Sequence, residues 1–344
     1  MRGLAKMDLM AMRTPKDQGG LGYSFRSQVA IVEEVARVDF GLALALFSSA
    51  SMVAKLSREA PASVVRKLVP GMLAARHVGC TALSEPEAGS DLTAIQTQAQ
   101  RTAKGWVING RKAWIINASV ARVIILYAQT EADSGARGIA SFVIDADRKG
   151  FIREPAFGLA SRNTFGLGGF SLENYQVSDK QMLQPPGQAF KLALAGVNAA
   201  RVAVAAMACG MVAQCLDVAR AYGEERMTFG KRLREHQGWR WALADASTEL
   251  AAAKRLVESA CQCIDDGTDP QIAAAQAKLF ATRMAERQIP ALEQAIGAEG
   301  LRASQPFGRH QFAARAANLV DGSSEMLRER IFAGMTCPLP AGPA

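Results

Sequence analysis

ALSEPEAGSDLTA, residues 82–94, gathers hydroxyl, carboxylate and glycine residues into one short segment. Pro86 and the run Gly89-Ser90-Asp91 favour a tight turn, which exposes backbone N–H groups beside a hydroxyl. Such donors suit a phosphate or a flat ring that accepts hydrogen bonds. Because ordinary loops share this composition, the segment gains meaning from the stretch that follows it.

That following stretch is WVINGRKAWIIN, residues 106–117. Its β-branched and aromatic residues alternate around Asn109-Gly110, a pair typical of a two-residue turn. We interpret the stretch as a β-hairpin with strands WVI and KAWII. A donor-rich turn followed by an aromatic hairpin predicts a binding site for a planar, phosphorylated ligand.

The pattern of residues changes twice along the chain. Residues 1–78 are mostly helical, and Ser27 is expected to begin one of their helices. Residues 79–183 contain β-branched runs bounded by Gly, Asp and Ser, which predict a compact antiparallel β-domain of seven or eight strands. Residues 184–344 again predict helices. The fold class is therefore α+β multidomain, with an N-terminal helical domain, a middle β-domain and a C-terminal four-helix bundle.

Three long helices are expected in the last segment. They cover Phe190–Tyr222, Gln237–Asp265 and a stretch that opens at Asp269-Pro270 and runs to Ile296, with Pro290 bending it. Shorter helices should follow Ser304 and Gly322. Long helices with short joints pack antiparallel to one another, as in a bundle.

Composition excludes several classes of function. The 344 residues are 49% hydrophobic and 21% charged, enough for one large or several modest cores, and the net charge is +8. The basic residues are scattered and show no run with interleaved aromatics, so nucleic acid is not an expected partner. The basic balance suits a phosphorylated ligand such as coenzyme A, or an acidic carrier protein. Most of these charges are solvated surface.

Cysteine usage and hydropathy bear on location. Only two of the six cysteines, Cys261 and Cys263, lie close together, so no metal site is expected, and the thiols indicate a reducing, cytoplasmic compartment. The first residues lack an apolar run long enough for a signal peptide. No 18 apolar residues are uninterrupted, so no membrane span is expected. Leu192–Val218 comes nearest, and its polar residues indicate a buried helix.

Together, the domain order and four motifs resemble the acyl-CoA dehydrogenase family over nearly the whole chain. The first motif is the segment of residues 82–94. There the resemblance implies that Ser84 hydrogen-bonds a flavin ring and that Ser90 holds the pyrophosphate of FAD, as hydroxyl and backbone donors can. In the second, it implies that Trp114 flanks the flavin and that Ile116 lies at the edge of its reactive N5.

The other two motifs lie in the helical segment. Glu225–Gly230, followed by His236-Gln237, resembles the family's ERxxFG turn, which implies that Arg226 and Phe229 reach the FAD of a neighbouring subunit. Gln294–Gly300 resembles the turn that wraps the FAD diphosphate, with Ala298 in place of a glycine. The resemblance also adds these cofactor-binding residues: Leu83, Gly89, Gln237, Gly297, Ser323 and Glu325.

By resemblance, the catalytic base is Asp321. The family uses a carboxylate, usually Glu, at this position, and the chain reads Val320-Asp321-Gly322 there. Some relatives place the base one residue before the arginine that matches Arg201, but that residue is Ala200. The alternative for Asp321 is a cap of the last helix, for which Asp before Gly-Ser is suitable. Both interpretations remain open from the sequence.

Several positions depart from the family pattern. Ile116 replaces a hydroxyl residue, Val320 replaces an aromatic one, and Gln311–Arg315 lacks an expected Arg and Asp. One or two opening helices are also absent from the sequence given. These departures support FAD binding more strongly than ordinary fatty acyl-CoA oxidation.

The expected function is that of a FAD-dependent acyl-thioester dehydrogenase acting on a CH–CH bond. Its substrate would be carried by coenzyme A or by an acyl carrier protein, and its electron acceptor would be a flavoprotein or oxygen. The family implies a homodimer or homotetramer. Two alternatives stay open: a flavin-binding scaffold or partner subunit, and a flavin-dependent monooxygenase on the same fold.

Overall fold

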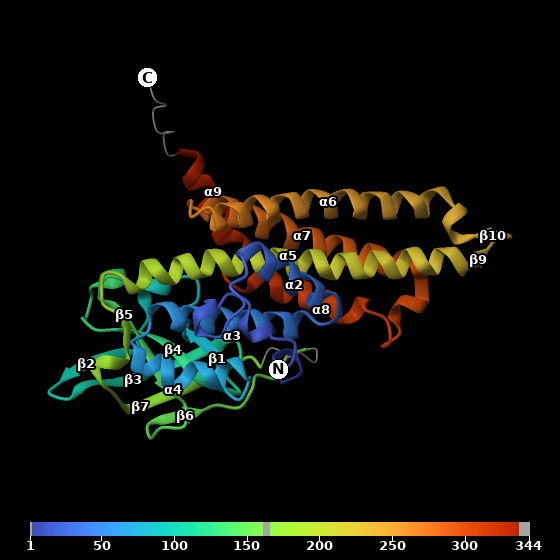
Figure 1. The fold of residues 1–344 in the computed structure, drawn as a ribbon. Coiled ribbons are helices and arrows are strands. Elements are labelled where there is room, and N and C mark those ends of the chain that lie inside the picture. The colour runs from blue at the N-terminus through green and yellow to red at the C-terminus, as the bar shows by residue number, and fades with distance from the viewer. Residues whose placement is uncertain (1, 161–165, 337–344) are drawn as a thin grey trace. The chain divides into compact units, whose positions relative to one another are not determined.

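The computed structural model describes residues 2–160 and 166–336, and the chain forms two compact units (Figure 1). The first unit comprises Met1–Ser24 and Leu44–Gly196, and the second comprises Phe25–Ala43 and Val197–Ala344. The divisions fall inside α3 (Phe40–Glu59) and α5 (Ala189–Glu225), so each of these helices contributes to both units.

An eight-stranded sheet dominates the first unit. Its strand order is β6-β7-β3-β2-β4-β5-β8, with β1 paired to β4. The strands are β1 (Val78–Ala82), β2 (Gln98–Thr102), β3 (Gly105–Ile115), β4 (Ala121–Gln129), β5 (Ile139–Asp145), β6 (Phe151–Arg153), β7 (Gly168–Val177) and β8 (Met182–Gln184). The 3-10 turns η3 (Leu92–Ala94), η4 (Gly135–Gly138) and η5 (Asp179–Gln181) join them. The middle β-domain and its expected strand number are confirmed.

The sheet is mixed, whereas the sequence predicted an antiparallel one. β1 and β2 both pair in parallel with β4, and the other pairings are antiparallel. Parallel strands are joined by long connections and not by tight turns. Turn residues in the sequence therefore give no indication of these pairings. The core side chains of the sheet include Ile108, Ile124, Phe142 and Tyr175, all fully buried.

The predicted hairpin turn at Asn109-Gly110 is wrong. β3 runs unbroken through both residues, and it forms its hairpin with the preceding strand β2, where Thr102 pairs with Gly105. Gly110 marks a register shift against β7 instead. A Cβ at this glycine would stand 2.6 Å from the Cα of Thr97, so the position requires a residue without a side chain.

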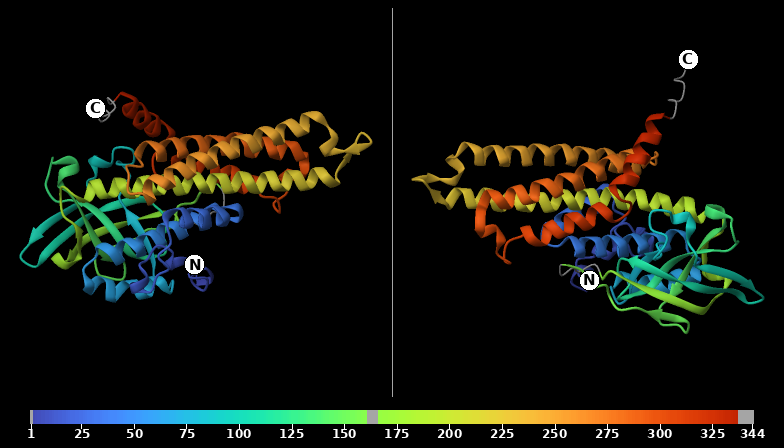
Figure 2. Two further views of the ribbon diagram at one scale, coloured as in Figure 1. Left: turned by 45° about the horizontal axis from the view of Figure 1, so that its top comes forward. Right: turned by 180° about the vertical axis from the view of Figure 1, so that it is seen from behind.

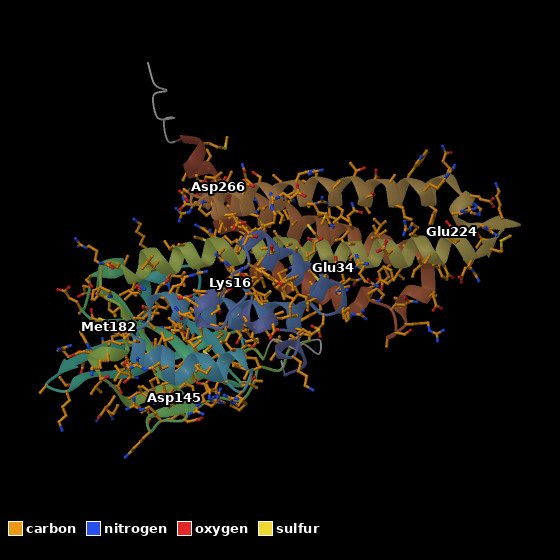
Figure 3. All side chains as sticks on the ribbon, in the orientation of Figure 1. Lys16, Glu34, Asp145, Met182, Glu224 and Asp266 are labelled. Atoms are coloured by element: carbon orange, nitrogen blue, oxygen red, sulfur yellow. The ribbon has the colours of Figure 1, made fainter. Side chains whose placement is uncertain are left out.

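Helices complete the first unit. α1 (Arg2–Ala5) and the turns η1 (Leu9–Ala11) and η2 (Lys16–Gln18) open the chain, and α4 (Ala62–Leu73) follows α3. Figure 3 labels one side chain on each of the neighbouring strands β5 and β8, with Asp145 at the end of β5 and Met182 at the start of β8.

In its described residues, the second unit is helical apart from a two-stranded hairpin. It contains α2 (Phe25–Val38), most of α5, the hairpin strands β9 (Met227–Thr228) and β10 (Lys231–Arg232), the turns η6 (Leu233–Glu235) and η7 (Gly297–Leu301), and α6 (Gln237–Asp265), α7 (Gln271–Ile296), α8 (Phe307–Leu319) and α9 (Ser324–Thr336). α5, α6 and α7 run side by side in Figures 1 and 2. The predicted C-terminal helical domain is confirmed.

α2 starts two residues before the predicted Ser27. The amides of Phe25 and Arg26 donate to the carboxylate of Asp265, at 2.7 Å and 3.0 Å. A carboxylate at a helix N-terminus satisfies N–H groups that would otherwise lack partners. Because Asp265 lies at the far end of α6, the local sequence gives no sign of this cap.

Two helices, α3 and α5, are long and apolar enough to cross a membrane by length and composition. The apolar window of α3 is 78% buried inside the protein, and that of α5 is 72% buried. A buried core helix passes the same test, so this is a weak indication of a membrane span.

Candidate functional site

The donor-rich segment follows β1, as the loop between that strand and η3. Leu83 is buried and Ser84 half-buried, whereas Gly89 and Ser90 are exposed. No protein atom lies within 4 Å of the position where a side chain of Gly89 would begin. The carboxylate of Asp91 accepts from the amide of Thr93, which caps η3. The loop thus exposes the backbone of Gly89 and the side chain of Ser90 to solvent. Exposed backbone N–H and hydroxyl donors are what a phosphate site requires.

A buried ion pair ties this loop to β3. The Nζ of Lys112 lies 2.7 Å from the Glu85 carboxylate and donates to the Leu83 carbonyl at 3.0 Å. Glu85 also accepts from the amides of Gln96 and Thr97, at 2.6 Å and 3.0 Å. Lys112 and Glu85 thus tie the loop both to β3 and to the residues that follow η3.

The charges of this pair are shaped by burial. Burial works to raise the pKa of Glu85, but the Lys112 charge and the hydrogen bonds that the carboxylate accepts outweigh it, and the pKa is lowered. Burial lowers the pKa of Lys112 to about 8, against the opposing effect of Glu85. We infer an ionised Glu85 at neutral pH, because its carboxylate accepts from several N–H groups.

Trp114 and Ile116 lie at the end of β3, next to the loop. The amide of Ala113 donates to the Ser84 carbonyl at 3.2 Å, which joins the two predicted motifs in one place. Trp114 has φ 60 and is 58% exposed, with its ring 4.8 Å from that of Phe157. Ile116 is half-buried. An exposed indole in a left-handed backbone conformation is a feature that binding sites use.

Asn117 holds this bend in place. Its side-chain amide donates to the carbonyls of Ala45 and Gly79, at 3.1 Å and 3.2 Å, and its own φ is 65. These two bonds tie the chain just after β3 to α3 and to β1.

Arg226 and Phe229 lie in the β9–β10 hairpin that joins α5 to α6. Phe229 and Gly230 form its two-residue turn, with φ 48 and φ 78, as in a type I′ turn. The Phe229 side chain is 95% exposed, and Arg226 is also exposed. Within residues 2–160 and 166–336, Arg226 makes no ion pair. A strained, exposed phenylalanine beside an unpaired arginine is available to another molecule.

Gln237, Gln294 and Gly297 gather at the same end of the second unit. Gln237 begins α6, while Gln294 and Gly297 end α7. The indole of Trp239 connects the two helices, donating to the Ala295 carbonyl at 3.1 Å. In Figure 3, Glu224 marks this end of the helices and Asp266 marks the other.

Asp321 lies in the turn between α8 and α9. It has φ 56 and its neighbour Gly322 has φ 104. The Arg201 Nε donates to the Asp321 carbonyl at 2.9 Å, and a Cβ on Gly322 would stand 3.1 Å from an Arg201 nitrogen. The Asp321 carboxyl is desolvated, and burial raises its pKa although Lys278 and Arg201 oppose that rise. A carboxylate with a raised pKa is suited to removing a proton near neutral pH.

Asp321 lies outside the cap of the last helix. α9 begins at Ser324, so Ser323 holds the N-cap position and Glu325 is exposed in the first turn. The pKa of Glu325 is lowered, first by hydrogen bonding to its own backbone amide and then by Ser323. Ser323 and Glu325 therefore shape the start of α9, next to the turn that carries Asp321.

The predicted residues of the second unit fall into two groups. Asp321 is close to Lys278, near the start of α7, whereas Gln294 is near its end. From 278 to 294 the helix advances 16 residues, which is about 24 Å. Within the second unit, one chain therefore does not bring Asp321 together with Arg226, Phe229 and Gln294.

Sequence reasoning missed Lys278. Its side chain is fully buried on a face of α7 made by Ala274, Ala281 and Ala285, and its Nζ donates to the carbonyls of Asn318 and Gly322, at 3.2 Å and 2.6 Å. The signal was present, because a lysine in register with small core residues is unusual in an amphipathic helix.

The comparisons with known proteins decide the family. Models of the acyl-CoA dehydrogenase N-terminal, middle and C-terminal domains match residues 1–76, 80–175 and 187–336. The rat mitochondrial short/branched chain specific acyl-CoA dehydrogenase is 30% identical over 95% of this chain and 76% of its own length. The chain belongs to the acyl-CoA dehydrogenase family. It is an acyl-CoA dehydrogenase-like oxidoreductase, as the sequence predicted.

Solved structures agree with this fold. Butyryl-CoA dehydrogenase from Megasphaera elsdenii superposes with a TM-score of 0.93 at 26% identity, covering 97% of this chain and 88% of its own. The prolyl acyl carrier protein oxidase AnaB superposes with a TM-score of 0.92 at 20% identity, covering 97% and 89% of the two chains. The second likeness concerns the fold alone. Acyl-CoA dehydrogenases are FAD-dependent, and the open backbone at Gly89 and the exposed indole of Trp114 fit that cofactor.

The cysteines are consistent with small apolar residues of the core. Cys80, Cys209, Cys215 and Cys261 are buried, and burial raises the pKa of each thiol. Cys337 lies outside the described residues. Thiols of this kind are unreactive, so none of the four is a candidate nucleophile.

Proposed function

We propose that this acyl-CoA dehydrogenase relative binds FAD and oxidises an acyl thioester between its α and β carbons, with Asp321 as the base. The observation that carries the proposal is the half-buried Asp321 in its left-handed turn, which Arg201 and Lys278 hold through the backbone. A base for an α-proton needs a carboxylate whose pKa is above its usual range, and burial supplies that shift.

The residues divide the work as follows. Asp321 accepts the α-proton of the thioester on its carboxylate. The loop residues Leu83, Ser84, Gly89 and Ser90 would hold the flavin and its phosphates through backbone and hydroxyl donors, and Trp114 would cover the ring beside Ile116. Bound FAD would take the hydride that leaves the β-carbon.

Oligomerisation follows from the second unit. Arg226, Phe229, Gln237, Gln294 and Gly297 share one end of the helices, about 24 Å along α7 from the turn of Asp321. We propose that these residues contact the FAD of a second subunit in a homodimer or homotetramer. Two observations support this contact. The Phe229 side chain is 95% exposed although its ring meets that of His236 at 6.3 Å, and Arg226 makes no ion pair among the described residues.

The thioester carrier and the electron acceptor complete the proposal. The net charge of +8 suits the phosphates of coenzyme A and also an acidic acyl carrier protein. The acceptor would be an electron-transferring flavoprotein, as the family implies, or oxygen. Branched and short acyl groups are the first substrates to test, because the mitochondrial relative bears that description in its name.

An anaerobic assay tests the function. FAD-loaded protein is mixed with isovaleryl-CoA, butyryl-CoA or an acyl carrier protein loaded with the same acyl groups, and bleaching of the flavin absorbance is followed. Asp321→Asn should abolish bleaching while FAD stays bound, and Asp245→Asn, an exposed carboxylate of α6, should bleach like the parent. Bleaching of Asp321→Asn at the parent's rate would show that the base lies elsewhere.

A further inference from the structure

Two cations from two helices, the half-buried Arg201 and the fully buried Lys278, hold the turn of Asp321. Arg201 of α5 donates its Nε to the Asp321 carbonyl at 2.9 Å. Lys278 of α7 donates its Nζ to the Gly322 carbonyl at 2.6 Å and to the Asn318 carbonyl at 3.2 Å. The carbonyls of Asp321 and Gly322, the two residues with positive φ, thus each accept from a charged donor. Such hydrogen bonds are stronger than those between neutral groups.

Lys278 occupies a costly position. Its side chain is fully buried, and no carboxylate pairs with it among the described residues. The pKa of Lys278 is lowered to about 8, chiefly by burial, with the Asp321 charge opposing this fall and the Arg201 charge adding to it. A buried cation without an ion-pair partner destabilises a fold. The presence of Lys278 at this position therefore calls for a functional explanation.

We propose that Lys278 is a positioning residue for Asp321, which holds the catalytic turn in its left-handed conformation and keeps the carboxylate ionised by its charge. The proposal rests on the proposed function of Asp321 as the base. Asn318 shares the lysine, so the end of α8 and the turn are fastened to α7 together.

The charged groups around the turn come from four helices. Arg201 and Lys278 face it from α5 and α7, and Arg330 of α9 acts on Arg201. On α8, Arg315 is already paired with Glu286 of α7, at 2.6 Å. Lys278 and Arg201 are therefore the two cations that act on the Asp321 carboxyl, and substitution of Lys278 removes one of them.

The test compares Lys278→Met and Lys278→Gln with the parent in FAD-loaded protein. Methionine removes the charge and the donors, whereas glutamine removes the charge and keeps a donor. Thr282→Val is the matched control, because Thr282 is buried one turn along α7 and donates only to the Lys278 carbonyl. Isovaleryl-CoA is the probe, and the rate of anaerobic flavin bleaching is measured against pH.

Bleaching by the parent should rise with pH as Asp321 loses its proton. In both lysine variants this rise should move to higher pH by about one unit, which is about a tenfold lower rate on its acid side, because an attractive positive charge has been removed. Thr282→Val should keep the parent's profile. A purely structural role for Lys278 would change the amount of active protein and leave the pH profile in place.

Amide hydrogen exchange gives a second measurement that needs no thioester. Exchange in residues 319–327 should be about tenfold faster in Lys278→Met, because two charge-assisted hydrogen bonds are lost, and less changed in Lys278→Gln. An unshifted pH profile in both lysine variants, or unchanged exchange in Lys278→Met, would overturn the proposal. Loss of fold and FAD in both, with Thr282→Val intact, would also overturn it.

Failure of the proposed function would look different. If Asp321→Asn bleaches like the parent, the base is another group. If Asp321→Asn is inactive while both lysine variants keep the parent's pH profile, Asp321 remains the base and the role given to Lys278 is wrong.

Discussion

Asp321 is one methylene shorter than the glutamate usual in its family, and its backbone has φ 56. A shorter side chain withdraws the carboxylate by roughly 1 Å, and a displacement of that size costs about a hundredfold in rate. Asp321→Glu should therefore raise the rate of flavin bleaching by butyryl-CoA if reach alone limits it. A slower reaction in the variant would mean that the turn is built for the shorter side chain and for another acyl group.

Ile116 offers a second measurement on a single side chain. Isoleucine has no hydroxyl to donate, although its backbone N–H remains available. We expect Ile116→Thr to change the reduction potential or the absorbance spectrum of the bound flavin, with Ile115→Val, a buried strand residue, as control. An identical potential in the variant and the parent would place the Ile116 side chain away from the flavin.

At the scale of elements, the ion pair Glu85–Lys112 holds the loop between β1 and η3 against β3. Lys112→Met would leave a buried carboxylate without its cation, which costs about 3–5 kcal/mol of unfolding free energy. The loss should be measured by urea unfolding at pH 7. Adding Glu85→Gln should recover much of it, and a double variant as unstable as the single one would contradict this account.

The same pair predicts a pH dependence. The pKa of Glu85 is lowered in the folded state, so its stabilising contribution is present above its unfolded pKa and is lost as the pH falls through the folded value. In Lys112→Met this acid-side loss of stability should be absent. Parallel unfolding curves between pH 7 and pH 3 for parent and variant would argue against an ionised pair.

α7 supplies a second pH test, on the alkaline side of neutrality. Burial lowers the pKa of Lys278 from 10.5 to about 8, so between these values the unfolded chain binds a proton that the folded chain lacks. Unfolding free energy then rises with pH by about 1.4 kcal/mol per unit. The parent should gain on the order of 3 kcal/mol relative to Lys278→Met between pH 8 and pH 10.5. A difference that is constant over this range would mean that Lys278 titrates normally.

For the whole molecule, the prediction is that FAD retention depends on association. Arg226→Ala should weaken FAD retention by tenfold or more, while the circular dichroism and the thermal midpoint of the helices stay as in the parent. Arg234→Ala, which removes an arginine already paired with Glu224 in the same region, is the control. The measurements are FAD dissociation and sedimentation velocity. A monomer that holds FAD tightly would refute the shared site.

Much of the fold could be read from local patterns. α6 covers Gln237–Asp265 and α7 ends at Ile296, as predicted, because long runs with helical spacing carry their own boundaries. The eight strands were anticipated in number from β-branched runs. The family also followed from the sequence, because the motifs that carry the resemblance are short and contiguous.

Only the tertiary structure decided the rest, because each of these features depends on residues far apart in the chain. The parallel pairing of β1 with β4 and the cap that Asp265 gives to α2 have no local signal. Asn109-Gly110 read as a turn, but the sheet needs Gly110 for a close approach to Thr97. The burial of Lys278 against Gly322 appeared only when α7, α8 and α9 packed, since hydrogen bonds between distant helices are set by packing and not by sequence spacing.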